Sequence, residues 1–259
     1  MPALLALDVG NTSVTVGAFE RRRLVARWEH PSDPKLSLKD WVGNFSRAAK
    51  KNRVSVDAAV FGSVVPPLDL KIHKAVETAF GVSPFQVSSI SPLGLGFKVK
   101  KPSEVGADRV LNALAAKEIY GLAAIIIDFG TATTFDCVSA DSEYLGGAIF
   151  AGPNMTAWAL KEKTAKLPLV DVRKPKRVVG KDTIECIQAG LYFGYLGMIE
   201  KILDLSLKEM KVSREKTHVV ATGGLSHLFK NDLPGDIFFA PNLTLEGLRL
   251  AWEKLRLLK

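Results

Sequence analysis

The sequence predicts an α/β protein that contains two copies of one structural unit. The first indication is a repeated pattern: residues 4–17 read LLALDVGNTSVTVG and residues 124–138 read AIIIDFGTATTFDCV. In each stretch an apolar strand ends at an aspartate and a glycine, and a strand rich in β-branched residues returns. The second indication is the helical spacing of apolar residues between such strands. Hairpins that alternate with helices favour mixed sheets flanked by helices.

The repeated pattern predicts a duplicated domain. Asp8 aligns with Asp128, and Ser13 aligns with Thr133, without a gap. The separation between the copies is too long for a solenoid repeat, in which each unit is a few tens of residues. We therefore expect an N-terminal lobe and a C-terminal lobe, which comprise residues 1–120 and 121–259.

Three segments have the apolar spacing of helices: residues 106–121, 154–167 and 183–210. The longest of them carries Gly190, Gly194 and Gly197 on one face. Each glycine inside a helix costs about 1 kcal/mol relative to alanine, so three together need a reason. We expect a close approach of another helix on this face, either within the chain or from a second subunit.

Composition limits the classes of function. The formal net charge is +8, but the basic residues are dispersed and are not interleaved with aromatic residues, which favours attraction of small anionic substrates over nucleic-acid binding. No apolar stretch approaches the roughly 20 residues that a membrane helix needs. The N-terminus lacks a basic leader, and the two cysteines form neither a metal-binding spacing nor a disulfide framework. We expect a cytoplasmic protein without a membrane or nucleic-acid partner.

Each hairpin is suited to binding phosphate. Its glycine lets the N–H groups of the turn approach a ligand closely, and the hydroxyl groups that follow can donate to phosphate oxygens. A carboxylate and a phosphate repel each other, so the aspartate needs a cation such as magnesium, or a water, between them. A single hairpin of this kind would be an ordinary turn capped by aspartate, but the second copy favours a polyphosphate site. The hydroxyl residues are Thr12, Ser13, Thr131 and Thr133.

A third glycine-containing segment follows a strand near the C-terminus. The predicted strand around residues 217–222 ends in Gly223-Gly224, which allows a flat ligand such as a nucleoside to pack against the backbone. The chain contains no G-x-x-x-x-G-K-[ST] motif, so nucleotide binding by a P-loop is excluded.

The segment Gly106-Ala107-Asp108-Arg109 contains a candidate base. Asp108 lies in the first turn of a predicted helix, where the helix dipole favours an ionised carboxylate, and an ionised aspartate can accept a proton from a hydroxyl. Arg109 offers a planar fork for a carboxylate. On local grounds alone, an N-terminal capping aspartate beside a surface arginine explains the same residues.

The duplicated hairpins resemble those of the actin, hexokinase and Hsp70 ATPase superfamily, whose lobes have the ribonuclease H-like fold. The resemblance is more specific in an ordered set of motifs that covers nearly the whole chain and is similar to type III pantothenate kinases. These motifs are DVGNT, GSVVPP, EVGADRVLNALAA, IDFGTATTFD, YLGGAI, TAKLP, Gly180 to Thr183, and TGG.

This resemblance implies a kinase that transfers the γ-phosphate of ATP to pantothenate, forming 4′-phosphopantothenate in the first step of coenzyme A biosynthesis. It implies that Asp108 is the base, that Asp8 lies near magnesium, and that Asp128 binds a monovalent cation, potassium or ammonium. It also implies a homodimer whose pantothenate pocket is completed by the partner. The ATP-binding residues it implies are Asp8, Val9, Gly10, Asn11, Thr12, Ser13, Val14, Thr15, Thr131, Gly223 and Gly224, and the substrate-binding ones are Gly106, Ala107, Asp108, Arg109, Thr183 and Val99.

The chain departs from the family pattern before Gly106. The family has Tyr-x-Asn-Pro there, and the tyrosine contacts pantothenate, whereas this chain has Val99 and Lys101 at those positions. One alternative is therefore a kinase of the same fold for another small hydroxy acid. A second alternative is a catalytically weak regulatory protein, which would be expected to lack the base or a phosphate hairpin. Both are intact in this sequence.

Overall fold

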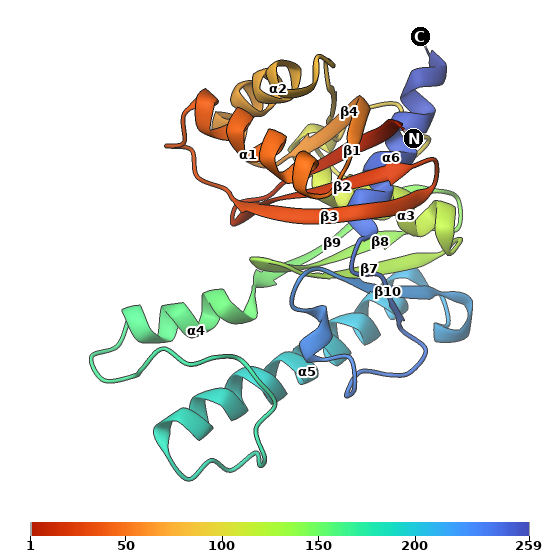
Figure 1. Ribbon diagram of the computed structural model, residues 1–259. Coiled ribbons are helices and arrows are strands. Elements are labelled where there is room, and N and C mark those ends of the chain that lie inside the picture. The colour runs from red at the N-terminus through yellow and green to blue at the C-terminus, as the bar shows by residue number, and fades with distance from the viewer. Residues whose placement is uncertain (1, 259) are drawn as a thin grey trace. The chain divides into compact units, whose positions relative to one another are not determined.

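The computed structural model describes residues 2–258, which divide into two compact units (Figure 1). Unit 1 contains the described residues up to 95, residues 99–115, and the C-terminal residues from 243. Unit 2 contains residues 96–98 and 116–242.

Unit 1 has a mixed sheet of order β3-β2-β1-β4-β5. The strands β1, β2 and β3 are antiparallel neighbours, whereas β4 and β5 run parallel to β1. A tight turn between β1 and β2 forms the first hairpin, as the sequence predicts. The strands are β1 (Pro2–Val9), β2 (Ser13–Glu20), β3 (Arg23–Pro31), β4 (Ser55–Ser63) and β5 (Phe85–Val87).

Helices cover both faces of the unit 1 sheet. On one face, α1 (Leu38–Lys51) and α2 (Pro66–Phe80) pack their apolar residues against alternate residues of β1, β2 and β4 (Figure 1). On the other face, α3 (Ala107–Ile119) and α6 (Leu243–Leu255) approach two small residues of the sheet: Gly17 contacts α6, and Gly62 contacts both helices. This second face carries the side chain of Asp8, because β-strand side chains alternate.

Unit 2 has a mixed sheet of order β11-β10-β7-β8-β9-β6. The strands β7, β8 and β9 are antiparallel neighbours, while β10 runs parallel to β7 and β11 parallel to β10. The strands are β6 (Gly96–Phe97), β7 (Ala124–Phe129), β8 (Ala132–Val138), β9 (Glu143–Ala151), β10 (His218–Thr222) and β11 (Phe238–Phe239).

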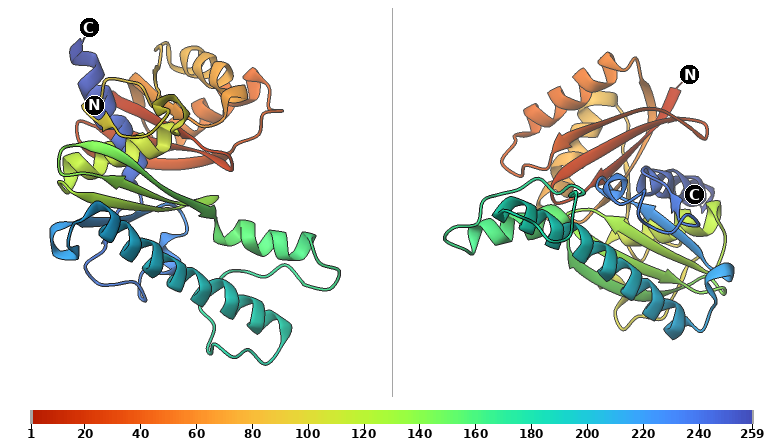
Figure 2. Two further views of the ribbon diagram at one scale, coloured as in Figure 1. Left: turned by 180° about the vertical axis from the view of Figure 1, so that it is seen from behind. Right: turned by 90° about the horizontal axis from the view of Figure 1, so that it is seen from below.

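The long helix α5 (Thr183–Met210) covers one face of this sheet. Its Tyr192, Tyr195, Ile199 and Leu203 pack in one cluster with the apolar residues of β7, β8 and β10. Phe229 lies in the same cluster and stacks on both tyrosines. Figure 2 shows that α4 (Pro153–Glu162) and the start of α5 extend beyond the end of the sheet.

The order of the strands confirms the predicted fold class. The series β3-β2-β1-β4-β5 in unit 1 corresponds to β9-β8-β7-β10-β11 in unit 2, and each series has the same parallel and antiparallel neighbours. The strand β6 is an addition at the edge of the second sheet. Two elements differ from a division at residue 120, because α6 packs in unit 1 and β6 belongs to unit 2.

The predicted helices are present. α5 has the expected bounds, and α3 begins at Ala107 and is followed by Gly121, whose φ of 99° is readily adopted by glycine. α4 ends at Glu162, earlier than the apolar spacing suggests.

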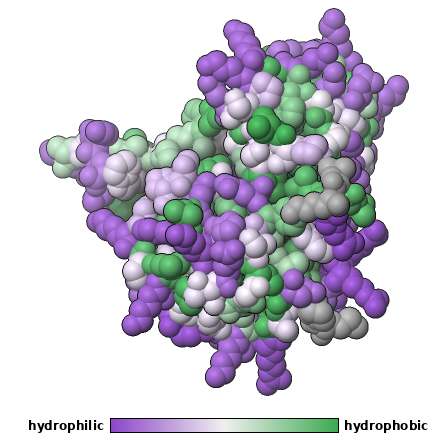
Figure 3. All heavy atoms as spheres, turned by 90° about the horizontal axis from the view of Figure 1, so that it is seen from above, coloured by the Kyte–Doolittle hydropathy of each residue, from purple (hydrophilic) through white to green (hydrophobic). Residues whose placement is uncertain are grey.

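The surface agrees with dispersed charge. In the face shown in Figure 3, hydrophilic side chains project around the outline and apolar atoms form small patches between them. None of the helices within residues 2–258 combines the length and the apolar character needed to cross a membrane.

Candidate functional site

The first hairpin presents Asp8 at the end of β1. Asp8 is paired with Thr15 on β2 and with Gly62 on β4, and it is half-buried. The turn is closed by the N–H of Gly10, which donates to the carbonyl of Ser13 at 3.0 Å. Asn11 and Thr12 are exposed at its tip, whereas the side chains of Val9 and Val14 are fully buried. The two valines can therefore offer a ligand only their backbone groups.

The candidate base meets the first hairpin at Gly62. Gly62 is the β4 neighbour of Asp8, and a β-carbon placed on it would lie 3.7 Å from that of Ala107 and 2.7 Å from Leu111 of α3. A side chain at Gly62 would displace the Leu111 side chain, so the glycine helps α3 to pack closely on β4. The first turn of α3, which contains Asp108, and the end of β1, which contains Asp8, therefore adjoin the same residue within unit 1.

Asp108 has a crowded environment. Its Oδ1 accepts a hydrogen bond of 2.8 Å from the backbone N–H of Arg109. A β-carbon on Gly106 would lie only 2.4 Å from this same oxygen, so a larger residue there would displace the Asp108 carboxylate. Burial raises the pKa of the Asp108 carboxyl above its usual value of 3.8, against the opposing effects of the hydrogen bond and of the Arg109 charge. Such a carboxyl is a better proton acceptor than an exposed aspartate.

The second hairpin presents Asp128 at the end of β7. Asp128 is paired with Thr134 on β8 and with Thr222 on β10, an arrangement that corresponds to that of Asp8. The turn is closed by the N–H of Gly130, which donates to the carbonyl of Ala132 at 3.1 Å.

The turn of the second hairpin is one residue shorter than that of the first. Val14 pairs with Val9, but Thr133 pairs with Phe129. The ungapped alignment of Ser13 with Thr133 is therefore out of register after the turn. Thr133 is fully buried, so its hydroxyl is not available to a phosphate, whereas Thr131 is exposed at the tip.

Two glycines pack directly against the second hairpin. Gly223, with a φ of 86°, would place a β-carbon 2.4 Å from Oδ1 of Asp128. Gly152 would place one 2.3 Å from the carbonyl oxygen of Thr131, and its N–H donates to that oxygen at 2.9 Å. By contrast, nothing lies within 4 Å of a β-carbon on Gly224. Gly223 therefore holds the hairpin, and Gly224 faces open space.

Thr183 lies elsewhere in unit 2, at the start of α5. The N-cap Asp182 accepts a hydrogen bond of 2.8 Å from the N–H of Glu185, and the N–H of Lys181 donates to Glu185 at 2.9 Å. Thr183 is exposed and lines a hollow of about 710 Å³ together with Thr156 of α4 and Cys186.

The segment before Gly106 contains Val99 and Lys101. Val99 is half-buried, and Lys101 is exposed and forms an ion pair of 2.7 Å with Glu104. The Lys101 side chain therefore contacts the short helical turn Pro102–Glu104 that directly follows it.

The two strand-end aspartates can serve as cation ligands only together with other groups. Within residues 2–258 no three histidine, cysteine or acidic side chains are clustered as a metal site. Magnesium usually takes one or two protein carboxylates and completes its shell with phosphate oxygens and water, which fits a single carboxylate at a strand end.

Sequence reasoning did not identify Gly62 as part of the site. In the sequence, Gly62 is only a small residue before Ser63 at the end of a buried strand. Its position beside Asp8 becomes evident only from the pairing of β4 with β1. Sequence reasoning also assigned no role to Asn112, which is buried and joins α3 to α6 by accepting a hydrogen bond of 2.8 Å from the hydroxyl of Thr244.

Comparison with sequence families agrees with this geometry. A family model described as type III pantothenate kinase matches residues 4–205. A type III pantothenate kinase of Endomicrobium trichonymphae is 37% identical over 273 residues, which covers 96% of this chain and 98% of the relative. One from Koribacter versatilis is 39% identical over 264 residues, which covers 97% of this chain and 95% of the relative.

Solved structures agree on the fold. A Baf family transcriptional activator from Campylobacter jejuni has a TM-score of 0.58 at 16% identity, over 97% of this chain and 98% of that chain. An archaeal actin homologue has a TM-score of 0.52 at 15% identity, over 97% of this chain and 99% of that chain. At these identities the likeness is one of fold alone, and the fold is that of the actin-like ATPases.

Proposed function

Because this chain belongs to the type III pantothenate kinase family and therefore phosphorylates pantothenate with ATP, we propose that Asp108 is the base of that reaction. The primary hydroxyl of pantothenate must lose its proton as it attacks the γ-phosphate. Asp108 accepts that proton, and its raised pKa increases its basicity. Gly106 and Ala107 keep the backbone close to the substrate, since neither has a bulky side chain.

Each hairpin binds phosphate in this proposal. Residues 8–15 present backbone N–H groups and the hydroxyls of Thr12 and Ser13, and Thr131 presents a hydroxyl from the second hairpin. Asp8 holds magnesium, and Asp128 holds potassium or ammonium. When bound, these cations neutralise charge on the phosphates, which is the main requirement of phosphoryl transfer. Gly223 supports Asp128, and the open side of Gly224 accommodates the nucleoside.

Arg109 binds the carboxylate of pantothenate in this proposal. Its planar guanidinium suits a carboxylate, and it follows the base directly. Thr183 adds a hydroxyl contact from its hollow. Val99 replaces the family tyrosine, so the pocket has one polar contact fewer and we expect a lower affinity for pantothenate.

A homodimer is supported by the exposed face around α4 and α5. The three glycines of α5 have nothing within 4 Å of a β-carbon in the described chain. Large apolar side chains are exposed nearby: Met155 is 42%, Trp158 53% and Ile184 47% exposed. We propose that a second copy covers this face and completes the pantothenate pocket. We also propose a cytoplasmic location, where ATP and pantothenate are available.

The observation that carries the proposed site is the meeting of Asp8 and the first turn of α3 at Gly62. The experiment is an assay of ADP release with ATP, magnesium and potassium, in which pantothenate is compared with a panel of other small hydroxy acids. We expect the highest kcat/KM with pantothenate. A higher value with another hydroxy acid would favour the kinase of altered specificity suggested by Val99 and Lys101.

A further inference from the structure

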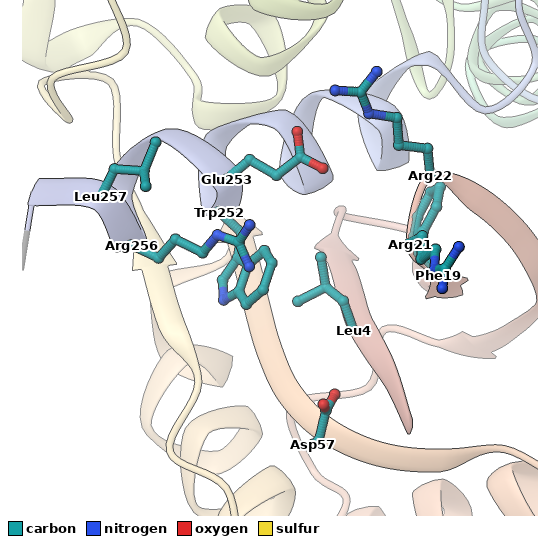
Figure 4. Close-up of a pocket in the computed structure, with 9 residues that line it drawn as sticks. All are labelled: Leu4, Phe19, Arg21, Arg22, Asp57, Trp252, Glu253, Arg256 and Leu257. Carbon is teal, nitrogen blue, oxygen red and sulfur yellow. The ribbon is translucent and has the colours of Figure 1, made fainter. Parts of the chain in front are cut away.

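A separate hollow of about 470 Å³ lies at the opposite end of the unit 1 sheet from Asp8 (Figure 4). Leu4 and Phe19, both buried, belong to its lining. Leu4 lies four residues before Asp8 on β1, or about 13 Å along the strand. Substrates of open α/β sheets bind beyond the carboxyl ends of the strands. This hollow lies at the amino ends of β1 and β4, so it is not part of the kinase site.

The charges that line the hollow favour an anion. Glu253 shares Arg249 with Glu246, at 2.8 and 2.9 Å, so this arginine does not neutralise both acids. The lining has three arginines and two acids, which leaves an excess of one positive charge. These residues are Arg21, Arg22, Arg256, Asp57 and Glu253.

The hollow also has an aromatic wall. The guanidinium of Arg256 lies 4.4 Å from the centre of the Trp252 ring, which holds the arginine at the rim (Figure 4). A guanidinium binds phosphate oxygens in a bidentate manner. The combination of guanidinium groups with Trp252, Phe19 and Leu4 suits a ligand with an anionic end and an apolar body.

Arg21 lies in the turn at one end of the hollow. Arg21 and Arg22 are the two residues between β2 and β3, and Arg21 has a φ of 55°. Two-residue hairpin turns prefer glycine, asparagine or aspartate at positions with positive φ, because a side chain is strained there. Replacing Arg21 with glycine therefore removes the guanidinium without adding backbone strain.

We propose that this hollow binds a phosphomonoester with an apolar or aromatic body. A phosphomonoester is anionic at neutral pH, which suits the positive excess of the lining. Arg21 binds the phosphate at one end of the hollow, and the body of the ligand lies against Trp252 and Arg256 at the other end (Figure 4). Asp57 accepts a hydrogen bond from a hydroxyl group of the ligand.

α6 connects this hollow to the base of the kinase reaction. Trp252 and Arg256 lie at its C-terminal end, and Thr244 near its start donates a hydrogen bond of 2.8 Å to Asn112 of α3. Gly247 packs so closely on α3 that a β-carbon would lie 2.3 Å from the carbonyl oxygen of Leu111. α3 begins with the turn that contains Asp108. A ligand that shifts α6 therefore shifts the base, so the hollow is an effector site.

The binding test uses 1-naphthyl phosphate as the probe and isothermal calorimetry in the presence of saturating ATP and magnesium. We expect saturable binding of one probe per chain, about tenfold weaker in Arg21→Gly and in Arg256→Gln. The matched control is Arg53→Gly, because Arg53 is also an exposed arginine with a φ of 56° but does not line the hollow. The control should bind the probe as the wild type does, and Arg21→Gly should unfold at no lower a temperature than the wild type, because glycine suits the positive φ of this turn.

Two outcomes would overturn the proposal. The first is the absence of saturable binding, or equal binding by wild type and Arg21→Gly. The second outcome concerns the link through α6, and this part rests on the proposed kinase function. We expect the probe to change kcat of the wild type several-fold and to leave kcat of Arg21→Gly unchanged, so binding without any change in kcat would disprove the effector role. 1-Naphthol, which lacks the phosphate, should neither bind nor change kcat.

Discussion

At the residue scale, Asp108 is subject to two opposing effects. Burial disfavours its charge, while the N–H of Arg109 and the guanidinium of the same residue favour it, and burial is the larger effect. A group that is unfavourable for the fold but suited to proton transfer is typical of a catalytic site. An N-terminal capping role, the simpler interpretation of the sequence, does not require this burial.

We expect Asp108→Asn to lower kcat by roughly two to four powers of ten, because the substrate hydroxyl loses its proton acceptor. Nucleotide binding should persist, since the hairpins are unaltered. The measurement is ADP release together with ATP binding by calorimetry, and Glu104→Gln is the control because Glu104 is an exposed acid near the same helix. Unchanged turnover in Asp108→Asn would rule out the base and favour the regulatory alternative.

The raised pKa of Asp108 predicts a pH dependence. The base must be ionised, so kcat/KM should fall as the pH decreases through a pKa above 3.8, the ordinary aspartate value. Above its folded-state pKa the ionised carboxylate lowers the free energy of unfolding, because the unfolded chain ionises more easily. Below both pKa values it has no such effect. Asp108→Asn should therefore raise the melting temperature at pH 7 and have less effect at pH 4; the opposite order would contradict a raised pKa.

Gly223 and Gly224 allow a prediction with a matched control. Gly223→Ala should lower the free energy of unfolding by more than about 1 kcal/mol, because the residue has a positive φ and a new β-carbon would meet Asp128. Gly224→Ala should leave stability nearly unchanged, since the space beside it is open. Denaturant unfolding of both variants is the measurement. Equal losses of stability in the two variants would contradict the closer packing of Gly223 against the second hairpin.

At the element scale, the sequence predicts both hairpins but not their difference in length. The repeated Asp-x-Gly pattern reveals the strands and the turn, because strand and turn preferences are local. The one-residue shortening of the second turn depends on the pairing of Phe129 with Thr133, which residue identities do not determine. For the same reason the burial of Thr133 was not anticipated.

The glycines of α5 have a clearer explanation in the structure than in the sequence. The sequence left open whether another helix of the chain or a second subunit approaches them. Within the described residues nothing lies within 4 Å of a β-carbon at Gly190, Gly194 or Gly197. A close contact within the described residues is therefore not their reason, and we propose that a second subunit is.

We expect Gly194→Leu to weaken the dimer, because the added side chain prevents close approach of a second copy. In a monomer the same change should stabilise the helix by up to about 1 kcal/mol, since leucine favours helices more than glycine does. The measurement is sedimentation over a range of concentrations, with Glu209→Leu as an exposed control on the same helix. A wild-type association constant for Gly194→Leu would exclude this face from the interface.

At the scale of the whole molecule, the sequence predicts the duplication and most elements but not the place of α6. Strand order follows the hairpin pattern, and both sheets repeat it. The location of α6 depends on contacts between residues far apart in the chain, such as Thr244 with Asn112 and Gly247 with Leu111. Such packing has no local signature, so a division of the chain at residue 120 does not reveal it.

The duplication also leads to a prediction about cations, since each unit supplies one strand-end aspartate. If Asp8 acts through magnesium and Asp128 through a monovalent cation, activity should require magnesium together with potassium or ammonium. Asp128→Asn should then lose the potassium dependence while retaining the magnesium dependence, and Asp8→Asn should raise the magnesium concentration needed for half-maximal rate. The measurement is ADP release in titrations of each cation against a sodium background. Full activity of the wild type in sodium alone would show that Asp128 does not bind an activating cation, and its carboxylate would then serve only to order the second hairpin beneath Gly223.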